Sequence, residues 1–379
     1  MALRFFFQYP ETTGVDADML DLGSLDEVAA AAERAGFTGI ALTEHPVPSA
    51  RWLSGGGHQS LDPLVALGFA AAATERLKLL TNLVVAPYRN PFLLAKAAAT
   101  VDKLSGGRLI LGLGTGYQKS EFFALGVDFD ERNTLFDEAL EALPRHWSGE
   151  PFSQKGSHFD AREVIARPRP VQDPIPIWIG GNSRLSRRRV ARSAQGWMPM
   201  MGGAQLTATA RTPAIESLEQ LAGMIREVRE DAEANGRTDP VEVLSSYAGT
   251  SSLTPAADAD RHREAFAERE KAGITNMVIS VPSRSAAQTM EFLAAFGETY
   301  IALPATAGHN PSGFGRFKRI VTRQVCNIAG DNNAFISKAQ FPRQDGDHRT
   351  CVDIWSGSAW RSSWSSSCSS PGAGATCGF

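Results

Sequence analysis

The sequence predicts a parallel (β/α)8 TIM barrel followed by an irregular, low-complexity C-terminal tail. Eight short apolar runs alternate with helical segments along most of the chain, which is the pattern of a closed parallel barrel. Several runs are apolar at nearly every position, as in strands that are buried on both faces. Polar residues and glycines gather directly after the runs, where barrel enzymes place their sites. A doubly wound open sheet is the alternative fold.

The elements follow from start and stop signals along the chain. Ser24 and Glu27 form a capping box, and Gly36 ends the helix that they open. Two long segments, 46–60 and 147–170, fit neither strand nor helix, and we expect them to shield the site from water. The expected strands span 3–8, 37–43, 77–86, 108–114, 175–179, a run that starts at 197, 241–250 and 275–281. The expected helices span 24–35, 62–76, 91–104, 121–143, 184–192, 214–235, 256–271 and 286–296.

Composition narrows the class of protein. Hydrophobic residues make up 43% of the 379 residues and the formal net charge is -3, so we expect a globular protein without a nucleic-acid partner. The N-terminal apolar run is too short for a signal peptide, and we expect no membrane span. The sequence therefore predicts a cytoplasmic enzyme.

The barrel domain is expected to span 1–302, with a tail of different character over 303–379. The tail ends in SSSCSSPGAGATCGF, a low-complexity run in which we expect little packed structure. All four cysteines lie in the tail, and no Cys/His cluster has the spacing of zinc ligands. We therefore expect no metal site.

The segment from 174 to 201, PIPIWIGGNSRLSRRRVARSAQGWMPMM, reads as a strand, a glycine turn, a basic helix and a second strand. Gly180 and Gly181 permit a tight turn, and Asn182 or Ser183 can cap the helix that follows. A helix N-terminus presents free N–H groups and the positive end of the helix dipole. The turn is therefore a candidate phosphate site, although an ordinary βα turn with a solvated basic helix would look similar.

Other strand ends carry further candidates. His45 follows the second strand, next to Glu44, and Asn82 interrupts the third. The fourth run ends in GLGTGY, which lacks the third glycine of a dinucleotide-binding motif and the lysine of a P-loop. Its last residues, Thr115, Gly116 and Tyr117, can let a flat ligand approach the backbone, or the glycines can simply serve a turn.

The residues by themselves leave several functions open. No Ser/His/Asp or Cys/His arrangement is present, so the chemistry is expected to come from a bound cofactor that carries a phosphate. A phosphosugar isomerase or aldolase would need a lysine or carboxylate base at a strand end, and none stands out. A non-catalytic flavin-binding barrel would keep the phosphate turn but tolerate the loss of His45.

Three stretches resemble the luciferase-like monooxygenase superfamily, in particular the branch that uses the deazaflavin coenzyme F420. They are TEHPVP, LTNLVVAPYRNPFLLAKAAATVDKLSGGRLILGLGTGYQKSEFFALGVDFDER, and PIWIGGNS followed by RRVARSAQGWMP. The resemblance extends from residue 3 to about residue 302 and implies a (β/α)8 barrel. It also implies an F420-dependent oxidoreductase that acts on a small organic substrate, with an FMN-dependent monooxygenase as the alternative. Homodimers are common in this family.

The resemblance assigns roles to several residues. It implies that Gly180, Gly181 and Asn182 hold the cofactor phosphate, and that His45, with Glu44 beside it, lies against the cofactor ring. It implies a non-prolyl cis peptide bond between Asn82 and Leu83, under the ring. Some deazaflavin-dependent dehydrogenases have a glutamate proton donor after the GTG turn, where this chain has Tyr117. This difference makes their sugar-phosphate chemistry doubtful here.

Overall fold

The computed structural model describes residues 3–11, 19–247, 249, 253–281, 283–301, 334–342 and 348–356. The chain divides into two compact units, Met1–Gly308 and His309–Phe379. In the second unit the described residues form one antiparallel hairpin, β12 (Ala334–Pro342) paired with β13 (His348–Ser356). The sequence predicted no strand there.

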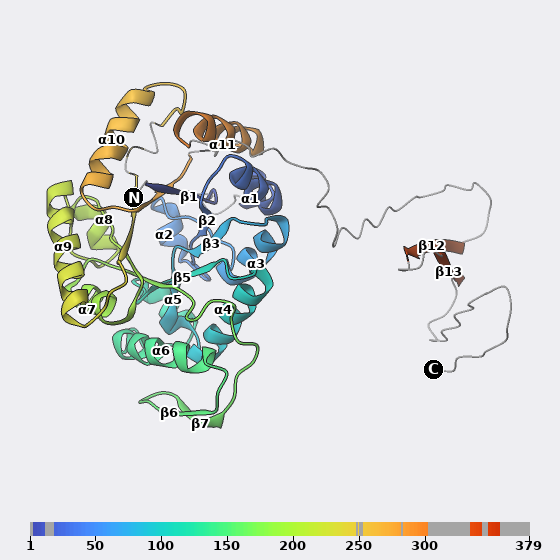
Figure 1. The fold of residues 1–379 in the computed structure, drawn as a ribbon, viewed down its shortest axis with the longest axis horizontal. Helices are drawn as coiled ribbons and strands as arrows, with labels where there is room; N and C mark the ends of the chain where they lie inside the picture. The colour runs from blue at the N-terminus through green and yellow to red at the C-terminus, as the bar shows by residue number, and fades with distance from the viewer. Residues whose placement is uncertain are drawn as a thin grey trace. The chain divides into compact units, whose positions relative to one another are not determined.

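Eight parallel strands close into a barrel in the first unit (Figure 1). They pair in the order β3, β2, β1, β11, β10, β9, β8, β5, and a pairing between β3 and β5 closes the ring. The predicted barrel is confirmed, and the open sheet is excluded. The strands are β1 (Arg4–Gln8), β2 (Gly39–Leu42), β3 (Lys78–Thr81), β5 (Leu109–Gly114), β8 (Ile177–Gly180), β9 (Gly196–Met198), β10 (Glu242–Ser246) and β11 (Asn276–Ile279). A short strand, β4 (Val84–Val85), continues the line of β3 and pairs with β5.

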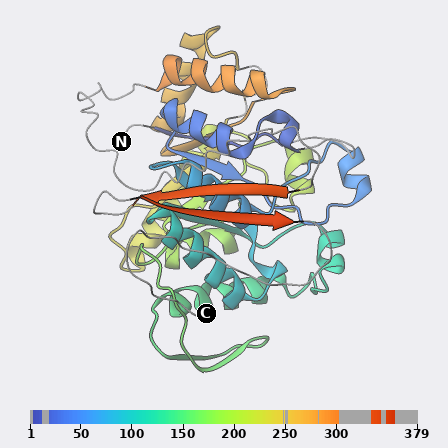
Figure 2. The ribbon, with the colours of Figure 1, turned by 90° about the vertical axis from the view of Figure 1, so that its right-hand side faces the viewer.

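Helices surround the strands, as Figures 1 and 2 show. The expected helix over 121–143 is two helices, because Gly126 adopts a φ of 71° and ends the first of them. The helices are α1 (Leu25–Arg34), α2 (Ala50–Ser54), α3 (Pro63–Ala73), α4 (Pro91–Ser105), α5 (Lys119–Ala124), α6 (Arg132–Trp147), α7 (Arg184–Ser193), α8 (Ala204–Thr209), α9 (Leu218–Ala234), α10 (Ala259–Lys271) and α11 (Ala286–Tyr300), with short 3-10 turns η1 (Met19–Leu22) and η2 (Ala86–Tyr88).

The barrel interior is filled by one buried apolar side chain from each of the eight strands. Trp178 is the largest of them, and its ring centroid lies 5.9 Å from that of Phe6. This layer closes the barrel below the strand ends, so a ligand is confined to the mouth. The layer consists of Phe6, Ala41, Leu80, Ile110, Trp178, Met198, Leu244 and Val278. A larger buried cluster, which includes Trp197, packs the strands against the helices.

The two long connecting segments differ in their placement. Segment 46–60 contains α2 and returns over His45 at the end of β2. Segment 147–170 forms an antiparallel hairpin, β6 (Phe152–Lys155) and β7 (Asp160–Val164), which extends away from the barrel in Figures 1 and 2. The hairpin contacts α4 through the ring of Phe92, which lies 6.0 Å from that of Phe152. Its described contacts therefore place it on the outer helices and do not support a role in shielding the site.

Candidate active site

His45 lies three residues beyond the last residue of β2, on the side of the carboxyl ends of the strands. Its backbone N–H donates to Oγ of Ser60 at 2.6 Å, and its ring centroid lies 4.5 Å from that of Trp52 in α2. The side chain is buried. Segment 46–60 therefore fixes the imidazole from one side.

A buried polar network contacts His45 from the other side. Nδ1 of His45 lies 3.0 Å from Nε2 of Gln118 and 3.4 Å from Oε2 of Glu121. The same carboxylate oxygen accepts a hydrogen bond from the hydroxyl of Tyr88 at 2.8 Å. Burial, together with the nearby Glu121 carboxylate, raises the pKa of Tyr88, so this hydroxyl remains a donor. Glu121 is only 1% exposed, and its other oxygen has no partner in the described part of the chain.

The sequence interpretation missed this network. The resemblance drew attention to the position immediately after the GTG turn, which is Tyr117 in this chain. The carboxylate stands four residues later, at Glu121 on α5. The only signal was a glutamate directly before two phenylalanines, Phe122 and Phe123, in a short helix. A charged residue in such an apolar context is buried only when it has a function or a partner.

Tyr117 approaches the same imidazole, with its hydroxyl 3.5 Å from Nε2 of His45. Burial raises the pKa of Tyr117 to about 12, so the phenol keeps its proton. Thr115 is partly exposed beside it. Gly116 has a φ of 79°, and a Cβ there would meet Val85 at 2.7 Å, so the turn itself requires this glycine.

Glu44 does not contact the His45 ring. Its carboxylate accepts the backbone N–H of Val85 at 2.7 Å and forms an ion pair with Arg89. Burial raises the pKa of Glu44, and the Arg89 charge opposes that shift. Glu44 therefore ties the end of β2 to β4 and η2, and Glu121, not Glu44, is the carboxylate beside His45.

The Asn82–Leu83 peptide bond is cis, as the resemblance implied. The side-chain amide of Asn82 donates to Oε1 of Gln8 at 2.9 Å, which links β3 to β1. The Leu83 side chain lies between the ends of β5 and β8: a Cβ on Gly114 or Gly180 would meet it at 2.4 Å or 2.3 Å. These two glycines thus give Leu83 the room to form an apolar platform at the mouth.

The predicted phosphate turn connects β8 to α7. Gly181 has a φ of 101°, which favours glycine, and Ser183 caps α7 by accepting the N–H of Ser186. The backbone N–H groups of Ser183, Arg184 and Leu185 have no acceptor within the described residues. These donors at a helix N-terminus suit a phosphate.

Asn182 has a different place from the one expected. It is fully buried, and its amide donates to the carbonyl oxygens of Met200 and Pro213 at 2.8 and 2.7 Å. Its own backbone N–H donates to Oγ1 of Thr212 at 2.8 Å. Asn182 therefore has no donor left for an anion and instead holds the turn in shape.

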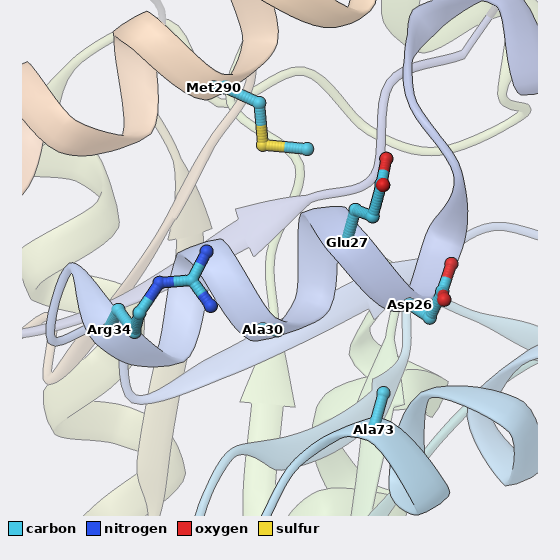
Figure 3. Close-up of a pocket in the computed structure, with 6 residues that line it drawn as sticks. All are labelled: Asp26, Glu27, Ala30, Arg34, Ala73 and Met290. Atoms are coloured by element: carbon cyan, nitrogen blue, oxygen red, sulfur yellow. The ribbon is translucent and has the colours of Figure 1, made fainter. Parts of the chain in front are cut away.

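A hollow on the described surface lies elsewhere. It has a volume of about 500 Å³ and lies between α1, α3 and α11, where Asp26, Glu27, Arg34 and Met290 line it (Figure 3). It is open to solvent and lies outside the barrel, away from the strand ends, so we do not assign the active site to it. In the described residues, every helix is too short or too polar to cross a membrane.

Comparisons with known proteins agree with this geometry. The family model for luciferase-like monooxygenases matches residues 1–297. An FMNH2-dependent dimethylsulfone monooxygenase from Pseudomonas putida is 30% identical over 57% of this chain and 55% of its own length. An F420-dependent glucose-6-phosphate dehydrogenase from Microbacterium testaceum is 29% identical over 59% of this chain and 65% of its own length.

The solved structures include the monooxygenase RslO1 from Streptomyces bottropensis, with a TM-score of 0.61 and 24% identity over 79% of this chain and 99% of its own. This likeness shows the fold. The protein described here belongs to the luciferase-like monooxygenase family, whose relatives above are oxidoreductases that depend on F420 or on reduced FMN. The chain spans between half and two thirds of the length of the curated relatives that it matches.

Proposed function

We propose that the protein is an F420-dependent oxidoreductase that transfers a hydride between the cofactor ring and a small organic substrate. The observation that carries the proposal is that three features lie on one side of the barrel, at the carboxyl ends of its strands. They are the free N–H groups at the start of α7, the apolar Leu83 side chain, and the pair of His45 and Glu121. Family membership supports a cofactor of this kind.

The residues present fit such a cofactor. The N–H groups of Ser183, Arg184 and Leu185 would hold its phosphate. Leu83 offers an apolar surface for a flat ring between Gly114 and Gly180. When bound, the deazaflavin ring supplies hydride acceptance or donation at carbon.

The charge on α7 favours F420 over FMN. Arg184, Arg188 and Arg192 are exposed at intervals of four residues, so they form one stripe that starts at the phosphate turn. In the described part of the chain none of the three has an acidic partner, whereas Arg187 pairs with Glu227. F420 differs from FMN in carrying carboxylates beyond its phosphate, and this stripe complements them.

His45 manages charge next to the ring. Its imidazole is held by Trp52 on one side and by Gln118 and Glu121 on the other. The side-chain amide of Gln118 donates to Nδ1, and the buried Glu121 carboxylate nearby favours positive charge on the imidazole when negative charge develops in front of Nε2. Replacement of His45 by alanine is expected to abolish turnover, and unchanged turnover would sink this role.

An FMN-dependent monooxygenase is the second candidate, and the relationship to the Pseudomonas putida enzyme favours it. Flavin has a ring nitrogen that deazaflavin lacks, and this nitrogen makes reduced flavin reactive towards oxygen. The identity of the cofactor therefore decides the reaction class. The third candidate is a non-catalytic flavin-binding barrel. Binding alone would not explain why the carboxylate of Glu121 is buried beside His45.

Parallel titrations of the purified chain with F420 and with FMN, followed by absorbance, test the proposal. Tight binding of F420 with weak binding of FMN is the expected result. The opposite preference would move the assignment to a monooxygenase, and binding of neither would overturn the cofactor site. A homodimer, expected from the resemblance, stays a prediction that light scattering on the same sample tests.

A further inference from the structure

The connection between β9 and α9 is a loop whose two ends are joined at its base. The backbone N–H of Gly202 donates to the carbonyl oxygen of Ile215 at 3.2 Å, which forms an isolated antiparallel bridge. Ile215 is fully buried, so the base of the loop is fixed to the core. Compact loops whose ends lie close together frequently have a function. We call residues 203–214, which include α8, the β9–α9 loop.

The β9–α9 loop holds the proposed phosphate turn from one side. Oγ1 of Thr212 accepts the backbone N–H of Asn182 at 2.8 Å, and the carbonyl oxygen of Pro213 accepts its side-chain amide at 2.7 Å. Asn182 directly precedes Ser183, the first of the residues whose N–H groups are free. Because Asn182 is fully buried, a change in the shape of this turn is transmitted to the loop.

Arg211, the residue before Thr212, contacts a second turn of the site. Its Nε donates to the carbonyl oxygen of Tyr117 at 3.1 Å. The backbone of Arg211 has a φ of 51°, in the left-handed region that few residues other than glycine adopt. Such a conformation persists only where the surroundings impose it. Residues 211–213 thus connect the phosphate turn to the turn that ends in Tyr117.

Tyr117 in turn faces the imidazole of the active site. Its hydroxyl lies 3.5 Å from Nε2 of His45, and the two ring centroids are 6.0 Å apart. The placement of this phenol depends on the backbone of Tyr117, which Arg211 contacts directly. A continuous set of contacts therefore leads from the phosphate turn, through Thr212 and Arg211, to His45.

The charges near Arg211 make its position sensitive to an anion. Its guanidinium lies 5.3 Å from the ring centroid of Phe129, and the same ring has Arg132 at 3.9 Å and Lys119 at 5.0 Å. In the described part of the chain none of these three cations forms an ion pair. Three like charges around one ring repel one another, and a nearby negative charge offsets that repulsion. An anion at the phosphate turn is therefore expected to strengthen the contact of Arg211 with Tyr117.

We propose that Arg211 is a positioning residue that couples occupation of the phosphate turn to the placement of Tyr117. A phosphate held by the N–H groups at the start of α7 attracts the guanidinium and tightens the β9–α9 loop. The phenol of Tyr117 is then held against Nε2 of His45. The inference rests on the proposed function in one respect, which is that the cofactor carries a phosphate, and it applies to F420 and FMN alike.

Fluorine NMR of the full chain labelled with fluorotyrosine tests the coupling without any turnover. The chain has five tyrosines, and the variant Tyr117→Phe identifies the signal of Tyr117. The probes are the F420 fragment that ends at the ribityl chain and the same fragment with its phosphate; FMN and riboflavin replace them if FMN is the cofactor that binds. Each pair shares one ring system and differs only in the phosphate. The Tyr117 signal is expected to differ between the two bound states, and Arg211→Ala is expected to abolish that difference.

The affinities of the same pair provide a second measurement. Arg211→Ala is expected to lower the preference for the phosphorylated probe by about tenfold, a typical strength for coupling between two sites. Arg211→Lys keeps the positive charge and a donor, so it is expected to restore most of the preference and of the Tyr117 response. Arg226→Ala, exposed on α9, is the control and should change neither.

The outcomes separate the two proposals. A Tyr117 signal that is identical with and without the phosphate overturns the coupling and leaves the proposed function standing. A difference that persists in Arg211→Ala also overturns it, and a lower phosphate preference in that variant would then mean that Arg211 binds the phosphate directly. Failure of both F420 and FMN to bind overturns the proposed function, and the coupling with it.

Discussion

Glu121 places a carboxylate oxygen 3.4 Å from Nδ1 of His45, in a position almost closed to solvent. The hydroxyl of Tyr88, a neutral group, donates a hydrogen bond to that oxygen. The second carboxylate oxygen of Glu121 has no partner among the described residues. A buried carboxylate with so few donors is costly unless a cation or a shared proton compensates it. The imidazole of His45 is the group placed to do so, which makes the two residues one functional unit.

The unit predicts the effect of Glu121→Gln. The amide keeps the shape of the side chain but removes the negative charge beside the His45 imidazole, so kcat/KM is expected to fall by about tenfold or more. Steady-state kinetics with the cofactor identified by titration provide the measurement. Glu141→Gln, exposed on α6, is the control, and an equal effect in both variants would contradict the coupling.

Ser183 has two tasks, and a matched variant separates them. It caps α7, so Ser183→Ala is expected to lower the free energy of unfolding by about 1 kcal/mol. The same cap holds the phosphate turn in shape, so the variant, although it keeps the backbone N–H of residue 183, is expected to bind cofactor more weakly. Ser285 caps α11 in the same way, by accepting the N–H of Gln288. Ser285→Ala should therefore lose similar stability and bind cofactor normally; weakened binding in both would show that stability alone is responsible.

The arginine stripe on α7 predicts a difference between cofactors. Replacement of Arg184 and Arg188 by alanine is expected to weaken the binding of F420 more than that of FMN, because only F420 carries further carboxylates. The salt dependence of F420 binding should fall in the same variant. Titrations at low and high salt provide the measurement, with Arg34→Ala, on the outer hollow, as the control. Equal losses for both cofactors would count against a role in recognising the tail of F420.

Pattern and spacing were enough to predict the barrel. Each strand is short and apolar, and the buried residue that each contributes to the interior layer, such as Leu80 or Val278, lies within a predicted run. His45 was found because a polar residue at the end of a barrel strand is conspicuous. The division of the helix over 121–143 was missed because the apolar spacing continues across the break at Gly126.

The partners within the site were harder to predict. Glu44 adjoins His45 in the sequence, yet its side chain faces Arg89 on the next connection. Glu121 lies far along the chain and reaches His45 only because α5 turns back over the mouth. Asn182 was expected to bind phosphate, but its hydrogen bonds go to Met200 and Pro213. Which way a side chain faces depends on tertiary packing, which spacing along the chain does not record.

His158 connects the hairpin of β6 and β7 to α6 through two carboxylates, and we call these contacts the His158 clasp; their strength depends on pH because His158 titrates. His158 lies 2.8 Å from Glu138 through Nδ1 and 2.8 Å from Glu131 through Nε2. Hydrogen bonds to Glu138 and Glu131 raise the pKa of His158 above its usual 6.5. A raised pKa means that the clasp contributes fully below about pH 6.5 and is lost as the pH rises through the folded value.

This clasp predicts that the hairpin opens more readily at alkaline pH. Hydrogen exchange of residues 152–164 should be slower at pH 6 than at pH 9, after correction for the intrinsic pH dependence of exchange. His158→Gln should remove that difference while leaving exchange in the barrel strands unchanged. A pH-dependent difference that persists in His158→Gln would mean that another group controls the hairpin.

Arg108 predicts the largest loss of stability. It is buried at the start of β5, and its guanidinium donates five hydrogen bonds of 2.7 to 3.1 Å. Their acceptors lie at the ends of α3 and α4 and before β3: Ala71 O, Thr74 O and Oγ1, Leu77 O and Ser105 O. Arg108→Met would leave these carbonyl groups without a donor, so the free energy of unfolding is expected to fall by about 3 kcal/mol. Arg108→Lys should recover only part of this loss, because an ammonium has three donors.

Urea denaturation of both variants, with the exposed Arg76→Met as control, provides the measurement. A loss in Arg108→Met no larger than that of the control would show that water replaces the guanidinium and that these elements hold together without it.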